Sequence, residues 1–505
     1  ASGERIDAAG SRFTVPDTRP KPSRGEIDVA ARGPLQAALS ILNNPPLRIM
    51  ERAKRPIDIA DAMASTQARI TLPLKDGIQT DDVTYRVTAE LSKVRSEQLV
   101  AGRVFASPEL RLVATPEAIG LDGPATLDGV PLTTSWRQPL GANASNGGRI
   151  TGRVALSPEA VSAFNLPLPD GMVSGQGSAD YQLTLPPDNA PSKLALFSDL
   201  RGLSLGLDAI GWRKPGNQAG ELSVSATLGA VPSVDELRLD APGLSLEGQL
   251  AFQDDGELDR VEFQNVKVGK WLDADVRLTP RPGGSPAISV IGGTLDLRQL
   301  DLGGRSRGGE GGPINLQLDR LTVSDGISLA PLTGRIEPGR LGLSGSFEAR
   351  VNGRTPVTGT LAPANAGTAI RIRSNNAGGV LRDAGLTPNA GGGTLDLVLT
   401  PVASAGSTFN GEFLIESIRL KDAPALAGLL DAISVVGLIN QLSGPGIRFD
   451  TIDGQFRLDR RQIRLRQAAA VGSSMGISAD GIYDLRTDQM DFRGVISPVY
   501  FLNGI

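Results

Sequence analysis

The stretch Val83-Thr84-Tyr85-Arg86-Val87-Thr88-Ala89-Glu90-Leu91 decides the fold of this chain. Its apolar side chains occupy every second position, and threonine, arginine and glutamate lie between them. Successive side chains of a β-strand point to opposite faces of the sheet, so this period of two predicts a strand with one apolar and one hydrated face.

Shorter runs of the same kind continue through the chain, separated by Gly, Pro or Asp turn signals. Among them we expect strands at residues 99–105, 110–114, 200–207 and 244–252. The 62 glycines and 35 prolines fit a chain with many turns. Short helices are expected at residues 34–42 and after Ser157, where a serine cap precedes a proline in the first turn. In total we expect roughly 35 strands and about 3 short helices.

So many strands cannot form one flat sheet, because twist makes a sheet of this size curl, coil or split. The one-sided alternation predicts that the curled sheet keeps one apolar face throughout. The alternative is that the strands form the halves of closed sandwiches, whose apolar faces meet each other.

The chain is expected to form one continuous sheet in several segments rather than separate domains. These are a preceding segment at residues 1–25, groove segments at 26–142, 143–280 and 281–418, and a last segment at 419–505. The Gly-rich run at 302–312 is expected to be a mobile loop. Strand-like pattern reaches both ends, so we expect the sequence to be an internal piece of a longer protein.

Residues 423–442 are the one long apolar segment in a chain that otherwise alternates. Asp422 and Pro424 suit the start of a helix of about 20 residues. Its apolar side chains lie nearly all round, so a covering surface is expected, and docking on the apolar face of the sheet is favoured over a membrane span. One stripe of this helix comprises Leu426, Leu429, Leu430, Ile433 and Val436.

The chain contains no histidine and no cysteine. This count excludes Cys/His zinc sites, serine or cysteine nucleophiles paired with histidine, and disulfides, so we expect neither an enzyme nor a cofactor or metal site.

The formal net charge is −4 with the two signs interspersed, which gives no reason to expect nucleic acid as a partner. The glycine runs 175–177 and 391–393 lack the Lys-Ser/Thr pair of a phosphate loop and are expected to be turns. In Trp212-Arg213-Lys214 we expect a tryptophan packed at a strand end with both cations in solvent.

Three segments resemble the AsmA-like family of Gram-negative envelope proteins, in its YhdP-like branch. They are residues 199–216 with Gly211-Trp212-Arg213, residues 374–382 with Ser374-Asn375-Asn376, and the run from 423 to 503 ending in Ser497-Pro498-Val499-Tyr500-Phe501. The resemblance covers about residues 26–505, and its last segment is the most specific. It implies an elongated, twisted, mostly antiparallel repeating-β-groove with an apolar concave face and a few short helices.

The resemblance also implies a function. Such a protein is anchored in the inner membrane, crosses the periplasm and carries phospholipids toward the outer membrane along its groove, with membrane-protein partners at either end. The alternative is a periplasmic scaffold or chaperone that assists outer-membrane protein assembly, as TamB-like relatives are thought to do. The residues expected to line the groove are Val83, Tyr85, Val87, Ala89, Leu91, Tyr181, Leu183, Leu185, Ile447, Phe449, Phe456, Leu458, Ile463 and Leu465.

Overall fold

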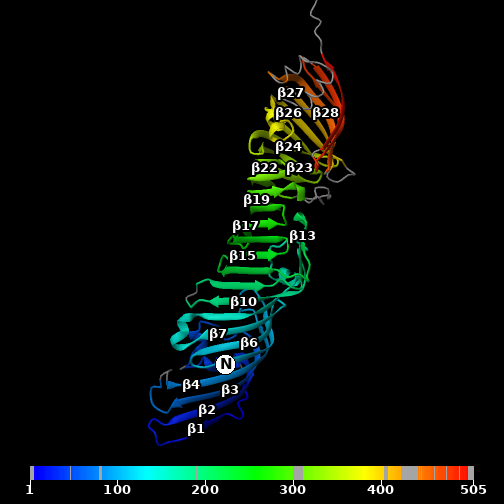
Figure 1. Ribbon diagram of the computed structural model, residues 1–505. Helices are drawn as coiled ribbons and strands as arrows, with labels where there is room; N and C mark the ends of the chain where they lie inside the picture. The colour runs from blue at the N-terminus through cyan, green and yellow to red at the C-terminus, as the bar shows by residue number, and fades with distance from the viewer. Residues whose placement is uncertain are drawn as a thin grey trace, which may run out of the picture. The chain divides into compact units, whose positions relative to one another are not determined.

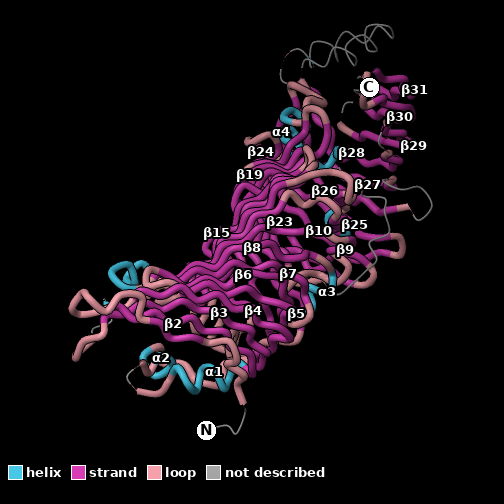
Figure 2. The backbone as a smooth tube through the Cα atoms, turned by 90° about the horizontal axis from the view of Figure 1, so that it is seen from below, coloured by secondary structure: helices cyan, strands magenta, loops and turns pink. Residues whose placement is uncertain are grey.

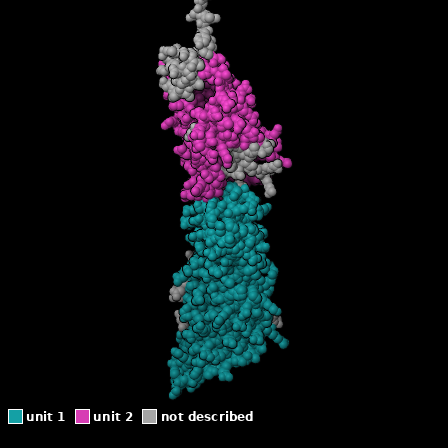
Figure 3. All heavy atoms as spheres, turned by 45° about the vertical axis from the view of Figure 1, so that its right-hand side comes forward, with its two compact units in different colours: residues 1–258 teal, residues 259–505 magenta. Residues whose placement is uncertain are grey.

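The computed structural model of the chain is mainly β, as the alternation predicts. Strands make up 64% of it, and in the part of the chain that the structure describes 28 strands belong to one large, mostly antiparallel sheet (Figure 1). The structure describes residues 5–45, 47–78, 82–187, 190–299, 311–402, 408–421, 442, 444, 446–459, 461–473, 475–487 and 489–498. The chain divides into two compact units, Ala1–Leu258 (unit 1) and Asp259–Ile505 (unit 2), coloured separately in Figure 3.

In unit 1 the described pairings of the large sheet are all antiparallel. Its strands are β1 (Arg12–Thr14), β2 (Arg24–Pro34), β3 (Asp61–Pro73), β4 (Thr84–Ser96), β5 (Phe105–Ala114), β6 (Ala118–Leu127), β7 (Val130–Pro139), β8 (Gly148–Leu156), β10 (Gly177–Leu185), β11 (Ser192–Ser198), β14 (Glu221–Leu228), β15 (Ser233–Ala241) and β16 (Leu244–Phe252). A separate three-stranded sheet comprises β9 (Val173–Gly175), β12 (Leu203–Leu207) and β13 (Trp212–Lys214).

The helices of unit 1 are short and lie between strands. They are α1 (Leu35–Leu42), α2 (Ile49–Arg52) and α3 (Pro158–Ala163), with 3-10 turns η2 (Gly141–Asn146) and η3 (Asp208–Ile210). Both helices expected from the sequence are confirmed: Pro34 precedes α1, and the Ser157 hydroxyl accepts the Ala160 N–H to cap α3. Figure 2 shows α1 and α2 beside β2 and β3. The strand expected at residues 99–105 is wrong, because residues 99–104 lie outside any strand and β5 begins only at Phe105. Gly102 has a φ of +70° in the turn at this place.

Unit 2 repeats the architecture with longer strands. They are β17 (Leu258–Val268), β18 (Leu272–Arg281), β19 (Gly284–Asp296), β20 (Ile314–Leu318), β21 (Arg320–Ser324), β22 (Ile327–Gly339), β23 (Gly342–Val351), β24 (Thr355–Ala364), β25 (Gly367–Ser374), β26 (Ala390–Pro401), β27 (Phe409–Leu420), β28 (Ile447–Leu458), β29 (Gln462–Val471), β30 (Met475–Asp484) and β31 (Gln489–Pro498). The helix α4 (Ala377–Asp383) joins β25 to β26, and the 3-10 turn η4 (Leu297–Gln299) follows β19.

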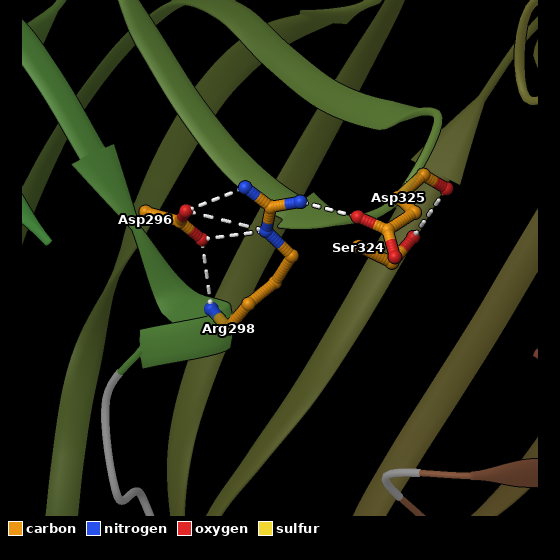
Figure 4. A network of polar contacts seen from close by, with 4 residues as sticks. All are labelled: Asp296, Arg298, Ser324 and Asp325. Carbon is orange, nitrogen blue, oxygen red and sulfur yellow. Dashed lines mark hydrogen bonds and ion pairs between the residues drawn. The ribbon is translucent and has the colours of Figure 1, made fainter. Parts of the chain in front are cut away.

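Parallel pairing occurs where β19 meets β20 and β21. Arg298 lies at this point and binds two carboxylates (Figure 4). Its guanidinium is 2.6 Å from Asp296 Oδ2 and also pairs with Asp325 at the far end of β21. Hydrogen bonds to Asp296 and Asp325 raise the pKa of Arg298, and this bridge joins the ends of the two parallel strands. Residues 300–310, most of the Gly-rich run, lie outside the described residues.

Candidate functional site

The strand register places the apolar side chains of unit 1 on a single face of the sheet. Residues directly opposite each other in an antiparallel pair share a face. Tyr85 lies opposite Ile70 on one side, and Ala89 lies opposite Leu112 on the other. The pairs continue strand by strand as Leu112↔Leu121, Leu121↔Trp136, Trp136↔Ile150, Ile150↔Leu183, Leu183↔Leu194, Leu194↔Ala226, Ala226↔Val234 and Val234↔Leu250. We call this surface the apolar face.

The opposite face of the same strands is charged and exposed. Cross-strand ion pairs on it join Arg69 to Asp28 at 2.8 Å and Arg153 to Asp180 at 2.7 Å, and their side chains are largely solvent-exposed. Exposed pairs of this kind add little stability, so they mark a hydrated surface rather than a second core. Phe197 departs from the pattern, since it lies on this face and is 49% exposed.

The apolar face is covered at one end of the strands and half-exposed at the other. Leu35 at the start of α1 packs against the buried cluster that includes Leu91 and Leu110, and Ala160 of α3 is buried in a cluster with Val154. Toward the other end the apolar side chains are only half-buried; these are Tyr85, Val87, Leu112, Leu121, Trp136, Ile150, Leu183 and Leu194. The described strands form one large sheet and one of three strands, so no separate sheet of comparable size is paired with this face.

Two tyrosines on the apolar face have pKa values above the ordinary value of a phenol. Burial raises the pKa of Tyr85, and nearby Glu117 adds to the effect. Burial also raises the pKa of Tyr181, whose hydroxyl donates to the Thr133 carbonyl oxygen at 3.1 Å. Partial burial thus disfavours the charged form of both phenol groups.

Unit 2 has an apolar face of its own, where aromatic rings lie over glycines of the neighbouring strands. A Cβ at Gly359 or Gly411 would overlap the ring of Phe347 or Phe456, respectively. A Cβ at Gly454 would come within 2.8 Å of the Phe413 ring. The far end of each ring therefore covers bare backbone of the neighbouring strand, where a side chain larger than glycine would not fit. Phe413 and Phe456 are also neighbours, with ring centroids 6.2 Å apart.

The residues expected to line the groove fall into two environments. Ala89 and Leu91 are buried in a cluster against which Leu35 of α1 packs, and Ile447 and Phe449 are 0% exposed in a core with Ile418. Val83 precedes β4 and is half-buried. The others lie in strands on the apolar face and are half-buried: Tyr85, Val87, Tyr181, Leu183, Leu185, Phe456, Leu458, Ile463 and Leu465. The stripe Leu426, Leu429, Leu430, Ile433 and Val436 lies outside the described residues.

Several features of the face were not expected from the sequence. Trp136, Ile150 and Phe413 lie on the apolar faces of their units. Alternation with polar neighbours could have found Trp136 and Ile150, but Phe413 is followed directly by Leu414. The glycine run 391–393, expected to be a turn, lies instead inside β26. The expectation that Lys214 lies in solvent is wrong, because this side chain is buried. Its Nζ donates to the carbonyl oxygens of Leu200 at 2.7 Å and Leu203 at 2.9 Å. Burial lowers the pKa of Lys214, and Asp199 opposes the shift. Trp212 and Arg213 lie as expected, buried and exposed respectively.

Comparison with protein-family models, with curated proteins and with solved structures finds no match to this chain. None of the helices in the described residues is long and apolar enough to cross a membrane. The described residues also hold no cluster of three or more carboxylates that could bind a metal ion. The apolar face is the candidate functional site.

Proposed function

We propose that the apolar face carries the acyl chains of phospholipids, and that the protein moves lipid between the inner and outer membranes of a Gram-negative envelope. The observation that supports this best is the succession of mostly half-buried apolar side chains that lie opposite one another from β3 to β16 in unit 1. Each CH₂ group of a chain laid on such a surface gains about 0.8 kcal/mol on full burial. The headgroup stays in water, so no specific side chain and no catalysis is required.

The proposal is tested by photo-crosslinkers placed on the two faces of β4. Tyr85 is half-buried on the apolar face, whereas the neighbouring Arg86 is exposed on the charged face. Lipid should crosslink at position 85 and not at position 86 in cells. Equal capture at both positions, or capture at neither, would contradict lipid transport on this face.

The second candidate function is a scaffold that offers a strand edge to outer-membrane proteins during assembly. β31 favours it, because Met490 and Val495 are 66% and 64% exposed and its described partner is β30 alone. An added strand would bind through main-chain hydrogen bonds along this edge. Crosslinkers at Val495 that capture an outer-membrane protein, together with lipid-free Tyr85, would favour this function over lipid transport.

A further inference from the structure

The joint between α1 and α2 presents four large aliphatic side chains to solvent. Ile41 and Leu42 end α1 and are 58% and 38% exposed. Leu47 and Ile49, on the α2 side of the turn, are 48% and 44% exposed. Four such residues close together in sequence form a group rather than single scattered exposures, and grouped exposures of this kind mark interaction surfaces. We call α1 and α2 with their connecting turn the helical hairpin.

The helical hairpin is held in a defined conformation, so the exposure does not come from a frayed helix end. The Asn43 side chain accepts the Glu51 N–H at 2.9 Å and ties the end of α1 to α2. Ala37 of α1 and Met50 of α2 are buried, so each helix has a side that packs inward. The aliphatic residues of the joint therefore lie on the outward side of an anchored hairpin.

Basic residues surround the same joint. Arg48, Lys54 and Arg55 are exposed, and Glu51 is the only acidic residue in the sequence from position 41 to position 57. Glu51 lies 3.7 Å from Arg48, but both side chains are more than half exposed and such a pair is weak. The charge beside the aliphatic group is therefore predominantly positive.

The next carboxylates along the chain lie at the base of the helical hairpin. Asp61 accepts a hydrogen bond at 2.6 Å from the Gln36 amide, in the first turn of α1 and about 10 Å along the helix from the joint. The carbonyl oxygen of Asp58 accepts one at 3.1 Å from the Gln98 amide, in the turn between β4 and β5. Both acidic residues thus lie where the hairpin rejoins the sheet.

We propose that the helical hairpin inserts into the surface of a bilayer that contains anionic lipid. An interfacial helix places aliphatic side chains among the acyl chains, while its Lys and Arg side chains extend to the phosphate groups. Each cation near an anionic membrane surface strengthens binding by about fivefold. The contact is argued from the hairpin alone and does not depend on lipid transport along the apolar face.

The first test uses single fluorescent labels, because the chain contains no cysteine and one introduced cysteine is labelled uniquely. Ile41→Cys places an environment-sensitive dye at the joint, and Leu341→Cys is the control, since Leu341 is 75% exposed in unit 2. With vesicles of phosphatidylcholine and phosphatidylglycerol, emission at position 41 should shift to shorter wavelength and be quenched by nitroxide-labelled lipid. Emission at position 341 should not change.

Flotation of the unlabelled full chain with the same vesicles measures the contribution of the aliphatic side chains. Ile41→Gln/Ile49→Gln should lose at least about tenfold in vesicle affinity. Because these side chains are exposed, the fold should be unaffected. The matched control, Leu341→Gln/Leu386→Gln, changes two exposed leucines of unit 2 and should bind like the wild type.

A second pair of variants tests the charge. Lys54→Gln/Arg55→Gln should weaken binding to the anionic vesicles by about tenfold and leave binding to pure phosphatidylcholine vesicles unchanged. Its control is Arg137→Gln/Arg149→Gln, exposed cross-strand partners on β7 and β8. The proposal is overturned if the label at position 41 stays in water, as in a hairpin that binds a protein, or if the control pairs lose as much affinity as the hairpin pairs. Neither result would alter crosslinking at Tyr85, so the two proposals fail separately.

Discussion

At the scale of single residues, glycines in the strands of unit 2 leave room for phenylalanine rings of the neighbouring strands. Phe347 lies between Gly334 and Gly359 of the strands on either side, and its ring occupies the space that a Cβ at Gly359 would take. In the same way, the Phe456 ring occupies the space of a Cβ at Gly411, and the Phe492 ring occupies the space of a Cβ at Gly481. Glycine in a strand normally weakens it, but here the aromatic ring replaces the missing side-chain contacts.

Gly359→Ala should therefore destabilise unit 2 by about 1–3 kcal/mol, because the ring of Phe347 has to move off the sheet. Gly284→Ala is the control, since a Cβ at this strand glycine meets nothing within 4 Å. Its effect should stay within about 0.5 kcal/mol. Denaturant unfolding measures both, and combining Gly359→Ala with Phe347→Leu should recover part of the loss. Equal costs for the two glycine variants would contradict the packing argument.

At the scale of elements, short helices close the apolar face where strands end, and α4 shows what holds one in place. The Asn376 side chain accepts the Gly379 N–H at 2.9 Å at its start. Asp383 at its last position is buried, and its Oδ2 accepts the Thr355 hydroxyl at 2.6 Å. That hydrogen bond is the main reason why the pKa of Asp383 is below its usual range, although burial opposes the shift.

The lowered pKa of Asp383 determines the direction in which the stability of unit 2 changes with pH. A carboxyl whose pKa is lower in the folded state stabilises the fold fully above its unfolded pKa of about 3.9 and loses that contribution as pH falls through the folded value. The stability of unit 2 should thus decrease on acidification below about pH 5, and Asp383→Asn should reduce this slope. Thr355→Val keeps the carboxylate but removes the donor, so it should reduce the slope in the same direction. Urea unfolding at several pH values measures it, and an unchanged slope in both variants would contradict this role.

At the scale of the whole chain, the sequence predicts the elements that depend on the spacing of apolar residues and on local helix capping. Alternation predicted the strands and their faces, and Ser157 and Pro34 predicted two helix starts. What it could not predict depends on partners distant in sequence. Leu99 and Val100 look like strand residues, yet they are 44% and 39% exposed in a turn. Lys214 is buried only because the carbonyl groups of Leu200 and Leu203 converge on it.

Contacts in each unit run almost wholly between strands that are hydrogen-bonded neighbours, with the short helices touching the strands beside them. The buried apolar residues of a unit gather in local clusters, such as those of β19–β25 and β26–β31, rather than in one common core. The free energy of unfolding should then be close to a sum of local terms, as in repeat proteins. A local defect should then loosen only the strands around it, since cooperative units in such a sheet are small. Gly359→Ala should speed amide hydrogen exchange in β23, β24, β25 and α4. Exchange in β3 and β4 should not change, and Gly284→Ala should alter neither region. If mass spectrometry shows Gly359→Ala accelerating exchange evenly from β3 to β25, the sheet unfolds as one cooperative core and the nearest-neighbour description is wrong.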